Sequence, residues 1–390
     1  MLMKRNTKIG IFPFSSIINN FYSFFKKNKE SLFSFFKELT DINTYSFNLE
    51  GINKCFDVFI ENVPESLEIE KIDRNVIIAN SNTDYILLMG HIDTVFPEEL
   101  GFNKLVENND KIYGPGVYDM KGGLIVALFA LIFLDSLELL QKVPVVFFIN
   151  SDEEIGSVYS KSLIESYAKK AKCAFVFEGS GENGEVVVGR KGKLGIKIET
   201  TGQASHAAYK ITNKPSAILE MAHKIIEIEA LNNEIEEISA NAGKIEGGLG
   251  PNTVAESCKL LVDFRFSKQY HESNIIENIK KICESNRVTG VTSKFNITSK
   301  RPCMEPEPNM PLYELVKEAS NLIGLKVKPQ VRPGVSDANF ISYCGIPVID
   351  GMGPTGANDH STQEFLIKSS IPERILLTSI SILKAATSFV

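Results

Sequence analysis

Short apolar runs that end in polar residues constrain the fold of this 390-residue chain more than any other feature. Several are followed by segments of helical periodicity, and this alternation is typical of an α/β layered domain with a mostly parallel sheet. A long apolar helix predicted at residues 122–140 should lie buried against that sheet. The apolar runs span residues 85–89, 143–150, 173–177 and 347–349.

Residues 192–300 follow a different order of predicted elements. Strand, helix, strand, strand, helix and strand succeed one another, as in a ferredoxin-like (βαββαβ) sandwich. Because chemically suggestive residues lie on both sides of this segment, we expect it to be inserted into the larger domain. The sequence therefore predicts a catalytic domain made of residues 1–191 and 301–390, and an inserted domain made of residues 192–300.

Charge and cysteine usage disfavour several classes of protein. The net charge of −6 comes without a long basic block, so we expect no nucleic-acid partner. No segment approaches the roughly 20 apolar residues of a membrane span, so we expect no membrane partner. The six cysteines stand singly, without C-x-x-C pairs, which favours the reducing cytoplasm.

A phenylalanine-rich segment near the N-terminus has two interpretations. Phenylalanines alternate with lysines in a partly helical rhythm between residues 21 and 36. This pattern suits either a membrane surface or a helix on the main domain. We favour the helix, with its aromatic side packed on the main domain.

Histidines and carboxylates gather in a few polar motifs after the apolar runs. A catalytic zinc takes three protein ligands and keeps one position open, and two zinc ions about 3.5–4 Å apart share a carboxylate. His91 and His360 can each bind one ion, and Asp119 can bridge both. Glu154 and Glu178 can complete the two sets. The sequence therefore predicts a site for two zinc ions per subunit.

Two further carboxylates beside these ligands have predicted roles of their own. Asp93, two residues after His91, can accept the other N–H of the imidazole and fix its tautomer. Glu153, which the ligand set does not need, is left free for proton transfer. Each acidic residue taken singly is more often a turn or helix-cap residue, and His223 and His271 are assigned to structure. The joint occurrence carries the metal hypothesis.

Six polar motifs, read in order, give the chain a family resemblance. They are GHIDTV at 90–95, GPGVYDMKGG at 114–123, SDEEIGS at 151–157, FE at 177–178, SHA at 205–207 and DH at 359–360. From about residue 36 onward the chain resembles the dizinc metallopeptidase and amidohydrolase family of glutamate carboxypeptidase, aminoacylase, acetylornithine deacetylase and succinyl-diaminopimelate desuccinylase. It looks nearest to the glutamate carboxypeptidase branch.

The resemblance implies a mechanism that agrees with the ligand inventory. Glu153 would deprotonate a bridging water and later deliver the proton to the leaving amine, so that a general base becomes a general acid. Asp93 would orient His91. The zinc ligands that the resemblance implies are His91, Asp119, Glu154, Glu178 and His360.

The resemblance also implies substrate-side residues, most of them in the inserted domain. In the family, the histidine that matches His206 reaches the active site of the partner subunit and stabilises an oxyanion, which implies a homodimer through the inserted domain. Arg301 resembles the carboxylate-binding arginine of the family. Asn252 is either a substrate contact or a turn asparagine, and Arg265 either contacts substrate or pairs with a neighbouring aspartate. The loop 334–338 resembles a substrate-side loop of the family, with a valine in place of one glycine.

These features lead us to expect a zinc-dependent hydrolase that releases a C-terminal amino acid from small peptides or N-acyl amino acids. An N-acetyl or N-succinyl amino acid deacylase is the alternative within the enzyme class. A non-catalytic metal or small-molecule binding module is the alternative outside it, although Glu153 and His206 would then have no use. A nucleotide-binding enzyme is disfavoured, because Asp119 replaces the third glycine of G-x-G-x-x-G.

Overall fold

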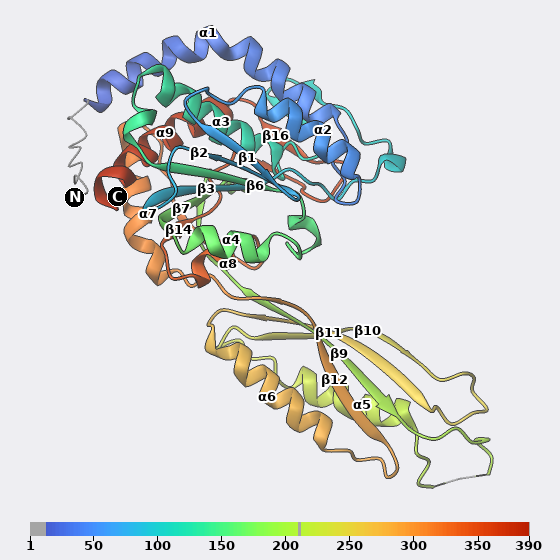
Figure 1. The fold of residues 1–390 in the computed structure, drawn as a ribbon. Coiled ribbons are helices and arrows are strands. Elements are labelled where there is room, and N and C mark those ends of the chain that lie inside the picture. The colour runs from blue at the N-terminus through green and yellow to red at the C-terminus, as the bar shows by residue number, and fades with distance from the viewer. Residues whose placement is uncertain (1–12, 210–211, 390) are drawn as a thin grey trace. The chain divides into compact units, whose positions relative to one another are not determined.

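The computed structural model describes residues 13–209 and 212–389, and the chain divides into two compact units. Each unit is a mixed α/β structure with a hydrophobic core of its own (Figure 1). Unit 1 consists of Met1–Val188, Pro306–Val331 and Ser336–Val390, and unit 2 consists of Gly189–Glu305 and Arg332–Val335.

A six-stranded sheet in the order β1-β2-β6-β3-β7-β14 forms the centre of unit 1. β6, β3, β7 and β14 run parallel to one another, whereas β1 and β2 form an antiparallel edge. The parallel strands are almost entirely buried, as expected for strands covered on both faces. The strands are β1 (Glu68–Ile72), β2 (Asn75–Ala79), β3 (Tyr85–His91), β6 (Val145–Asn150), β7 (Ala171–Val176) and β14 (Val348–Ile349).

Helices cover both faces of this sheet (Figure 1). α3 (Lys121–Ser136) and α9 (Ser370–Ser388) pack on one face beside β3, and α4 (Lys161–Ala168) and α8 (Ala338–Tyr343) pack on the other. α7 (Met310–Leu322) packs against α9. α3 is buried along nearly its whole length, as predicted.

The predicted end of α3 at residue 140 is wrong. The helix ends at Ser136, and Glu138 then adopts a positive φ of 56°, which turns the chain. A 3-10 turn, η2 (Leu140–Lys142), follows. Leu139 and Leu140, directly after Glu138, are apolar and buried, which is why periodicity alone extended the helix.

The phenylalanine-rich segment forms α1 (Phe14–Asp41), a 28-residue helix. Its buried side includes Phe21, Phe35 and Phe36, and Phe21 meets Phe133 of α3 edge to face with ring centroids 5.2 Å apart. The lysines of the segment are exposed. The packing interpretation is therefore confirmed. α2 (Leu49–Ile60) follows, with its first turn capped by the side chain of Asn48.

A second sheet in unit 1 was not predicted. Four short antiparallel strands pair in the order β15-β16-β5-β4, and β5 and β16 are neighbours although they lie far apart in sequence. The loop after β5 carries Asp119, and the loop before β16 carries His360. The strands are β4 (Val106–Asn108), β5 (Lys111–Tyr113), β15 (Gly356–Ala357) and β16 (Phe365–Ile367), and a separate pair is formed by β8 (Val186–Arg190) and β13 (Pro329–Arg332).

The elements of unit 2 follow one another as strand, helix, strand, strand, helix and strand. Its four strands form an antiparallel sheet in the order β10-β11-β9-β12. Burial alternates along β11, because one face of the sheet packs against the two helices and the other does not. The elements are β9 (Gly192–Thr201), α5 (Ala217–Glu229), β10 (Ser239–Gly247), β11 (Ser257–Phe266), α6 (Tyr270–Glu284) and β12 (Thr292–Arg301).

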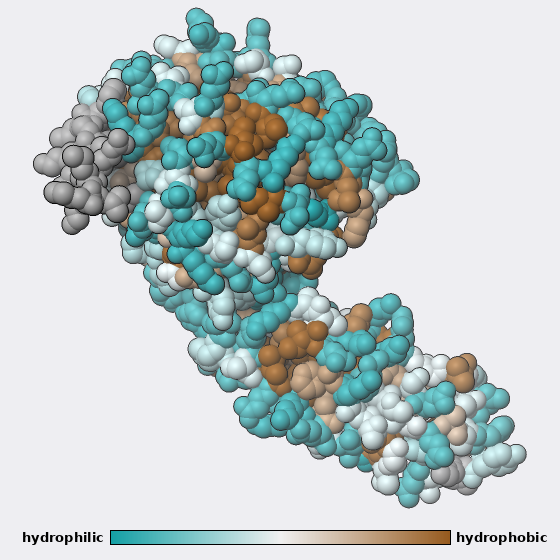
Figure 2. All heavy atoms as spheres, viewed as in Figure 1, coloured by the Kyte–Doolittle hydropathy of each residue, from teal (hydrophilic) through white to brown (hydrophobic). Residues whose placement is uncertain are grey.

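The surface and the cysteines add three observations. Hydrophilic side chains cover most of the face that Figure 2 shows, with apolar side chains exposed in smaller patches. All six cysteines are free thiols. Among the described residues, none of the helices has both the length and the apolar composition needed to cross a bilayer.

Candidate metal centre

Three parallel strands of the central sheet end beside one site. His91 is the last residue of β3, Glu178 follows β7 by two residues, and Glu153 and Glu154 lie in a turn just after β6. Because the carboxyl ends of parallel strands meet at one edge of a sheet, side chains far apart in sequence converge there. The fold therefore brings together the residues that the polar motifs predicted.

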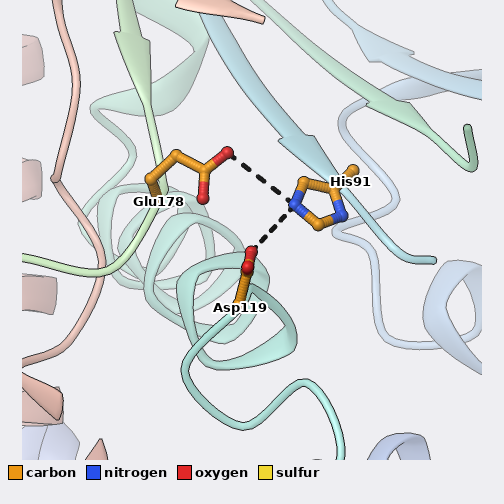
Figure 3. Close-up of side chains that lie close together, drawn as sticks. All are labelled: His91, Asp119 and Glu178. Atoms are coloured by element: carbon orange, nitrogen blue, oxygen red, sulfur yellow. Dashed lines mark hydrogen bonds and ion pairs between the residues drawn. The ribbon is translucent and has the colours of Figure 1, made fainter. Parts of the chain in front are cut away.

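A first group of ligating atoms is formed by His91, Asp119 and Glu178. The His91 Nε2 atom lies 3.1 Å from Oδ1 of Asp119 and 3.7 Å from Oε1 of Glu178. Figure 3 shows both carboxylates directed at this same ring nitrogen. The His91 side chain is only 2% exposed, so this group is held by the buried end of β3.

A second group is formed by Asp119, Glu154 and His360. The His360 Nε2 atom lies 3.0 Å from Oε2 of Glu154 and 3.3 Å from Oδ2 of Asp119. Asp119 thus offers one oxygen to each group, as a bridging carboxylate does. In contrast to His91, His360 lies on a loop and is 56% exposed.

Asp93 joins the histidine to the turn that carries the two glutamates. The Nδ1 atom of His91 lies 3.4 Å from Oδ1 of Asp93 and 3.1 Å from its backbone oxygen, so the backbone is the nearer acceptor. The Asp93 carboxylate also accepts the backbone N–H groups of Glu153 and Glu154, each at 3.2 Å, and the hydroxyl of Ser46 at 2.8 Å. Asp93 therefore holds His91 and the turn in one arrangement.

Protonation of these groups is strongly perturbed. Burial opposes a proton on His91, but hydrogen bonds to Asp119 and a second aspartate outweigh it and raise the pKa of His91 well above its usual range. Hydrogen bonds to Asp119 and Glu154 raise the pKa of His360 to about 11. Burial, reinforced by the charge of Asp119, raises the pKa of Glu154 to about 7 and that of Glu178 well above its usual range. The two imidazoles are therefore the cations that face these carboxylates.

Lysine and arginine do not balance this negative charge. In the part of the chain that the structure describes, neither residue type forms an ion pair with Asp119, Glu154 or Glu178. Carboxylates this close repel one another unless a proton or another cation lies between them. The arrangement is that of a site for divalent cations.

Sequence reasoning missed two buried charged residues beside the ligands. Glu364 accepts hydrogen bonds from backbone N–H groups of the Asp119 loop, and burial raises its pKa to about 8. Lys121, the first residue of α3, donates to the backbone oxygens of Leu39 and Ile42 at the end of α1, at 2.9 Å each. Their partners are backbone atoms, so no side-chain pattern in the sequence marks them.

Asp337, in the loop that resembles a substrate-side loop of the family, binds residues on both sides of the turn that carries the two glutamates. It is buried, and its carboxylate accepts hydrogen bonds from Ser157 and from Asn150, the latter at 2.7 Å. Ser157 and Asn150 flank the turn that carries Glu153 and Glu154. In the structure this loop residue therefore contacts the turn of the two glutamates.

The predicted substrate-side residues lie in unit 2. His206 is exposed, its Nδ1 atom accepts the backbone N–H of Ala208 at 3.2 Å, and its segment pairs with that of Asn252. Arg265 forms an ion pair with Asp263 at 2.8 Å, which is the structural alternative named for it. Arg301 is the last residue of β12 and is buried.

Known proteins resemble this chain in sequence and in fold. Residues 87–384 match the profile of peptidase family M20/M25/M40. The chain is 26% identical to carboxypeptidase G2 of Pseudomonas sp. (strain RS-16) over 302 residues, which are 75% of this chain and 72% of that protein. Aminopeptidase PepT from Bacillus cereus ATCC 10987 superposes with a TM-score of 0.76 at 23% identity, covering 93% of this chain and 99% of that one. The YXEP protein of Bacillus subtilis, a dinuclear metal binding peptidase, superposes with a TM-score of 0.69 at 14% identity, covering 92% and 98%.

The fold and the two acidic groups define a metal-dependent hydrolase. The family match covers most of the chain and shows the particular family: the chain belongs to peptidase family M20/M25/M40. The resemblance drawn from the six motifs is thereby confirmed, and the similarity to carboxypeptidase G2 agrees with the glutamate carboxypeptidase branch. Between a hydrolase and a non-catalytic binding module, the family match favours the hydrolase.

Proposed function

We propose that this protein is a zinc-dependent hydrolase that releases a C-terminal amino acid from small peptides or N-acyl amino acids, as glutamate carboxypeptidases do. One observation carries the proposal: Asp119, Glu154 and Glu178 converge on two imidazoles without a lysine or arginine partner among the described residues. Burial raises the pKa values of two of these carboxylates, so their ionised forms need a cation. Two divalent ions would supply it.

The spacing of the ligating atoms suits zinc. Zinc bonds of about 2.0–2.2 Å to nitrogen and oxygen place the donor atoms of a tetrahedral site about 3.4 Å apart. The histidine nitrogens lie between 3.0 and 3.7 Å from their carboxylate oxygens. His91, Asp119 and Glu178 would hold one ion, and Asp119, Glu154 and His360 would hold the other.

The residues of unit 1 divide the chemistry between them. When bound, the zinc ions would lower the pKa of the attacking water and polarise the scissile carbonyl. Glu153 would take the proton from that water and later give it to the leaving amine. Its backbone N–H is fixed by Asp93, so the Glu153 side chain starts from a held position. Asp93 would also keep His91 in the correct orientation.

Unit 2 would complete the site as an inserted ferredoxin-like domain, at about residues 192–300, that serves dimerisation and covers the substrate. The Nδ1 atom of His206 accepts a hydrogen bond, so a neutral ring carries its proton on Nε2 and is ready to donate to an oxyanion. Arg301 would bind the substrate carboxylate, and Asn252 would contact the substrate. For Arg265, the pair with Asp263 supports a structural role over substrate binding.

A homodimer through unit 2 is part of the proposal. α5 exposes three large apolar side chains, Ile218, Leu219 and Ile226. Exposed apolar side chains gathered on one helix are typical of an interface. In such a dimer, His206 of the partner subunit would act on the site of unit 1. We also assign the protein to the cytoplasm, where its six free thiols would stay reduced.

The alternative within the enzyme class is an N-acetyl or N-succinyl amino acid deacylase. The same ligand set and the same Glu153 would serve it, because both reactions hydrolyse an amide next to a carboxylate. The similarity to carboxypeptidase G2 favours the peptidase. The two differ in the acyl group that the enzyme accepts.

A substrate panel tests the proposal. Dipeptides and N-acetyl and N-succinyl amino acids are assayed with purified protein, with a chelator, and with the chelator followed by added zinc. We expect hydrolysis of dipeptides that the chelator abolishes and zinc restores. Hydrolysis confined to the N-acyl amino acids would establish the deacylase instead, and an absence of chelator-sensitive hydrolysis throughout would overturn the proposal.

A further inference from the structure

The loop that carries Asp119 and the loop that carries His360 are joined to two paired strands. Tyr113 ends β5 and pairs with Phe365, the first residue of β16. Beyond this pair the chain continues from β5 toward Asp119 and leads into β16 from His360. The two loops therefore lie side by side at their base, and the ladder of the sheet ends there.

Glu364 joins the two loops at this point. Its side chain is fully buried. Its Oε1 atom accepts the backbone N–H groups of Tyr118 at 2.7 Å and Asp119 at 2.9 Å, and its Oε2 atom accepts that of Gly116 at 3.0 Å. Its own backbone N–H donates to the oxygen of Ser361, next to His360, at 2.9 Å.

The three backbone N–H groups use both oxygens of the Glu364 carboxyl group. Both oxygens of a carboxyl group can accept hydrogen bonds, whereas a carboxamide offers one accepting oxygen and an NH2 group that only donates. A glutamine at position 364 would therefore face at least one backbone N–H with its own N–H. Gly116 allows the crowded approach, since its φ is 73° and a Cβ would lie 2.8 Å from a methyl group of Thr94.

We propose that Glu364 is a positioning residue that fixes the loops of Asp119 and His360 against each other and so sets the spacing of the second metal position. The inference rests on the proposed dinuclear site. Glu364 contacts the side chain of neither Asp119 nor His360. It binds the backbone of the Asp119 loop and is itself a residue of the His360 loop.

The two metal positions depend on Glu364 to different degrees. His91 is buried at the end of β3, so its position is set by the central sheet. His360 is mostly exposed on its loop and adopts a positive φ of 58°. Its distance to Asp119 is therefore set by the link between the loops. Loss of that link should affect the second position more than the first.

Zinc titration of a Glu364→Gln variant tests the inference. Competition with a chromophoric chelator gives stepwise dissociation constants, and His91→Ala and His360→Ala variants identify which step belongs to which group. We expect Glu364→Gln to weaken the His360 step by about 10- to 100-fold, the range seen when a residue behind a metal ligand is changed. The His91 step should stay close to that of the unaltered protein.

Glu220→Gln is the matched control. Glu220 is also fully buried and also accepts backbone N–H groups of a distant segment, Arg287 and Val288, at 2.9 and 2.7 Å, but it lies in unit 2. Its replacement should leave both zinc constants unchanged. Glu364→Asp, which keeps the carboxyl group and shortens the side chain, serves if the glutamine variant does not fold, and it should show the same selective loss.

The outcomes separate this inference from the proposed function. If the unaltered protein binds fewer than two zinc ions, the dinuclear site and the inference both fall. The unaltered protein could instead bind two zinc ions while both Glu364 variants keep the two zinc dissociation constants, or raise both equally. In that case only the inference about Glu364 falls. Failure of both variants to fold would also overturn it, because Glu364 would then be required by the fold and not by the site.

Discussion

Both units bury carboxylates, but they neutralise them in different ways. In unit 2, Glu220 and Lys224 lie one turn apart on α5, each about 1% exposed, with Nζ and Oε1 3.0 Å apart. The ammonium also donates to backbone oxygens at the end of α6, Ile282 at 2.7 Å and Ser285 at 3.3 Å. Burial opposes ionisation of Glu220, but hydrogen bonds from Val288 and Lys224 outweigh it and lower its pKa. Both charges of this pair therefore have partners from the chain.

The metal centre of unit 1 lacks such a partner. Among the described residues, its carboxylates pair with imidazoles and not with lysine or arginine. The pKa values of Glu154 and Glu178 are raised instead of lowered. A buried pair that the chain itself balances belongs to the fold, whereas a buried cluster with excess negative charge marks a place for a bound cation. The same residue type, a glutamate removed from solvent, thus has a structural role in one unit and a proposed metal-binding role in the other.

The largest expected effect is a loss of turnover that distinguishes Glu153 from its neighbour Glu154. Glu153→Gln should lower turnover by about 10²- to 10⁴-fold, the usual contribution of a general base, while zinc content stays normal. The Asp93 contact that holds the turn comes from the backbone of residue 153, so the substitution leaves it in place. Steady-state kinetics on a cleaved dipeptide and metal analysis of dialysed protein measure the two effects.

Glu154→Gln is the control for this prediction. It differs by one position in the same turn, but its side chain lies in the second ligand group. It should lose zinc as well as turnover. Full activity of Glu153→Gln would contradict the assignment of the base, and equal zinc loss in the two variants would contradict the division of roles.

The next effect tests the balanced pair of unit 2. Lys224→Met leaves Glu220 buried without its cation, and removal of one partner of a buried pair costs about 3–5 kcal/mol of unfolding free energy. Urea unfolding followed by circular dichroism measures the loss, and zinc content should not change. Replacement of both partners, Lys224→Met with Glu220→Gln, should recover part of the stability.

An exposed pair supplies the control for Lys224→Met. Lys281 and Glu277 on α6 approach to 2.8 Å with both side chains about two-thirds exposed, and water screens such a pair. Lys281→Met should therefore change the unfolding curve little. If Lys224→Met were equally harmless, burial of the pair in unit 2 would not be a source of its stability.

The parallel part of the fold was predictable because of where its strands lie. Strands buried on both faces read as continuous apolar runs, and those of β3, β6 and β7 stand out from their surroundings. The sheet of β5 and β16 was not predictable, since strands of three residues have no measurable periodicity and their pairing joins distant segments. The end of α3 was missed because buried leucines, Leu139 and Leu140, follow the turn at Glu138.

Some residues of the candidate site could likewise be predicted from the sequence, and others could not. The convergence of His91 and Glu178 was predictable because several histidines and carboxylates follow buried parallel strands, whose carboxyl ends meet at one edge of the sheet. One such residue alone would more often be a turn or cap residue, so their joint occurrence gave the prediction. Glu364 and Lys121 were not predictable, although both are buried, because their partners are backbone atoms of segments far away in the sequence. The loop of Asp337 was singled out, but its contact with the turn of the two glutamates was not predicted. In one sequence, residues such as Glu364 and Lys121 look like ordinary surface charges until the fold is known.

The smallest expected effect is the stabilisation of the folded protein by zinc, which should depend on pH in unit 1 and not in unit 2. Zinc at 100 times its dissociation constant should stabilise the folded protein by about 2.7 kcal/mol relative to protein treated with chelator. The pKa of Glu154, about 7 in the fold against an ordinary value of 4.5, means that the metal-free protein loses stability as pH rises through that window, because the ionised carboxylate is disfavoured there. Its neighbours are Asp119, which adds to the effect, and His91 and His360, which oppose it.

Zinc binding needs the same carboxylate ionised and the imidazole of His360 free of its proton, and the pKa of that imidazole is about 11 in the metal-free protein. Zinc affinity should therefore rise with pH, and the gap between the unfolding midpoints with zinc and with chelator should widen from pH 5 to pH 8. Scanning calorimetry at several pH values measures this gap. The balanced pair of unit 2 predicts no such dependence, since the pKa of Glu220 is lowered and the residue stays ionised throughout the window. A gap that stayed constant or narrowed would show that cation binding does not relieve the charge of the metal centre.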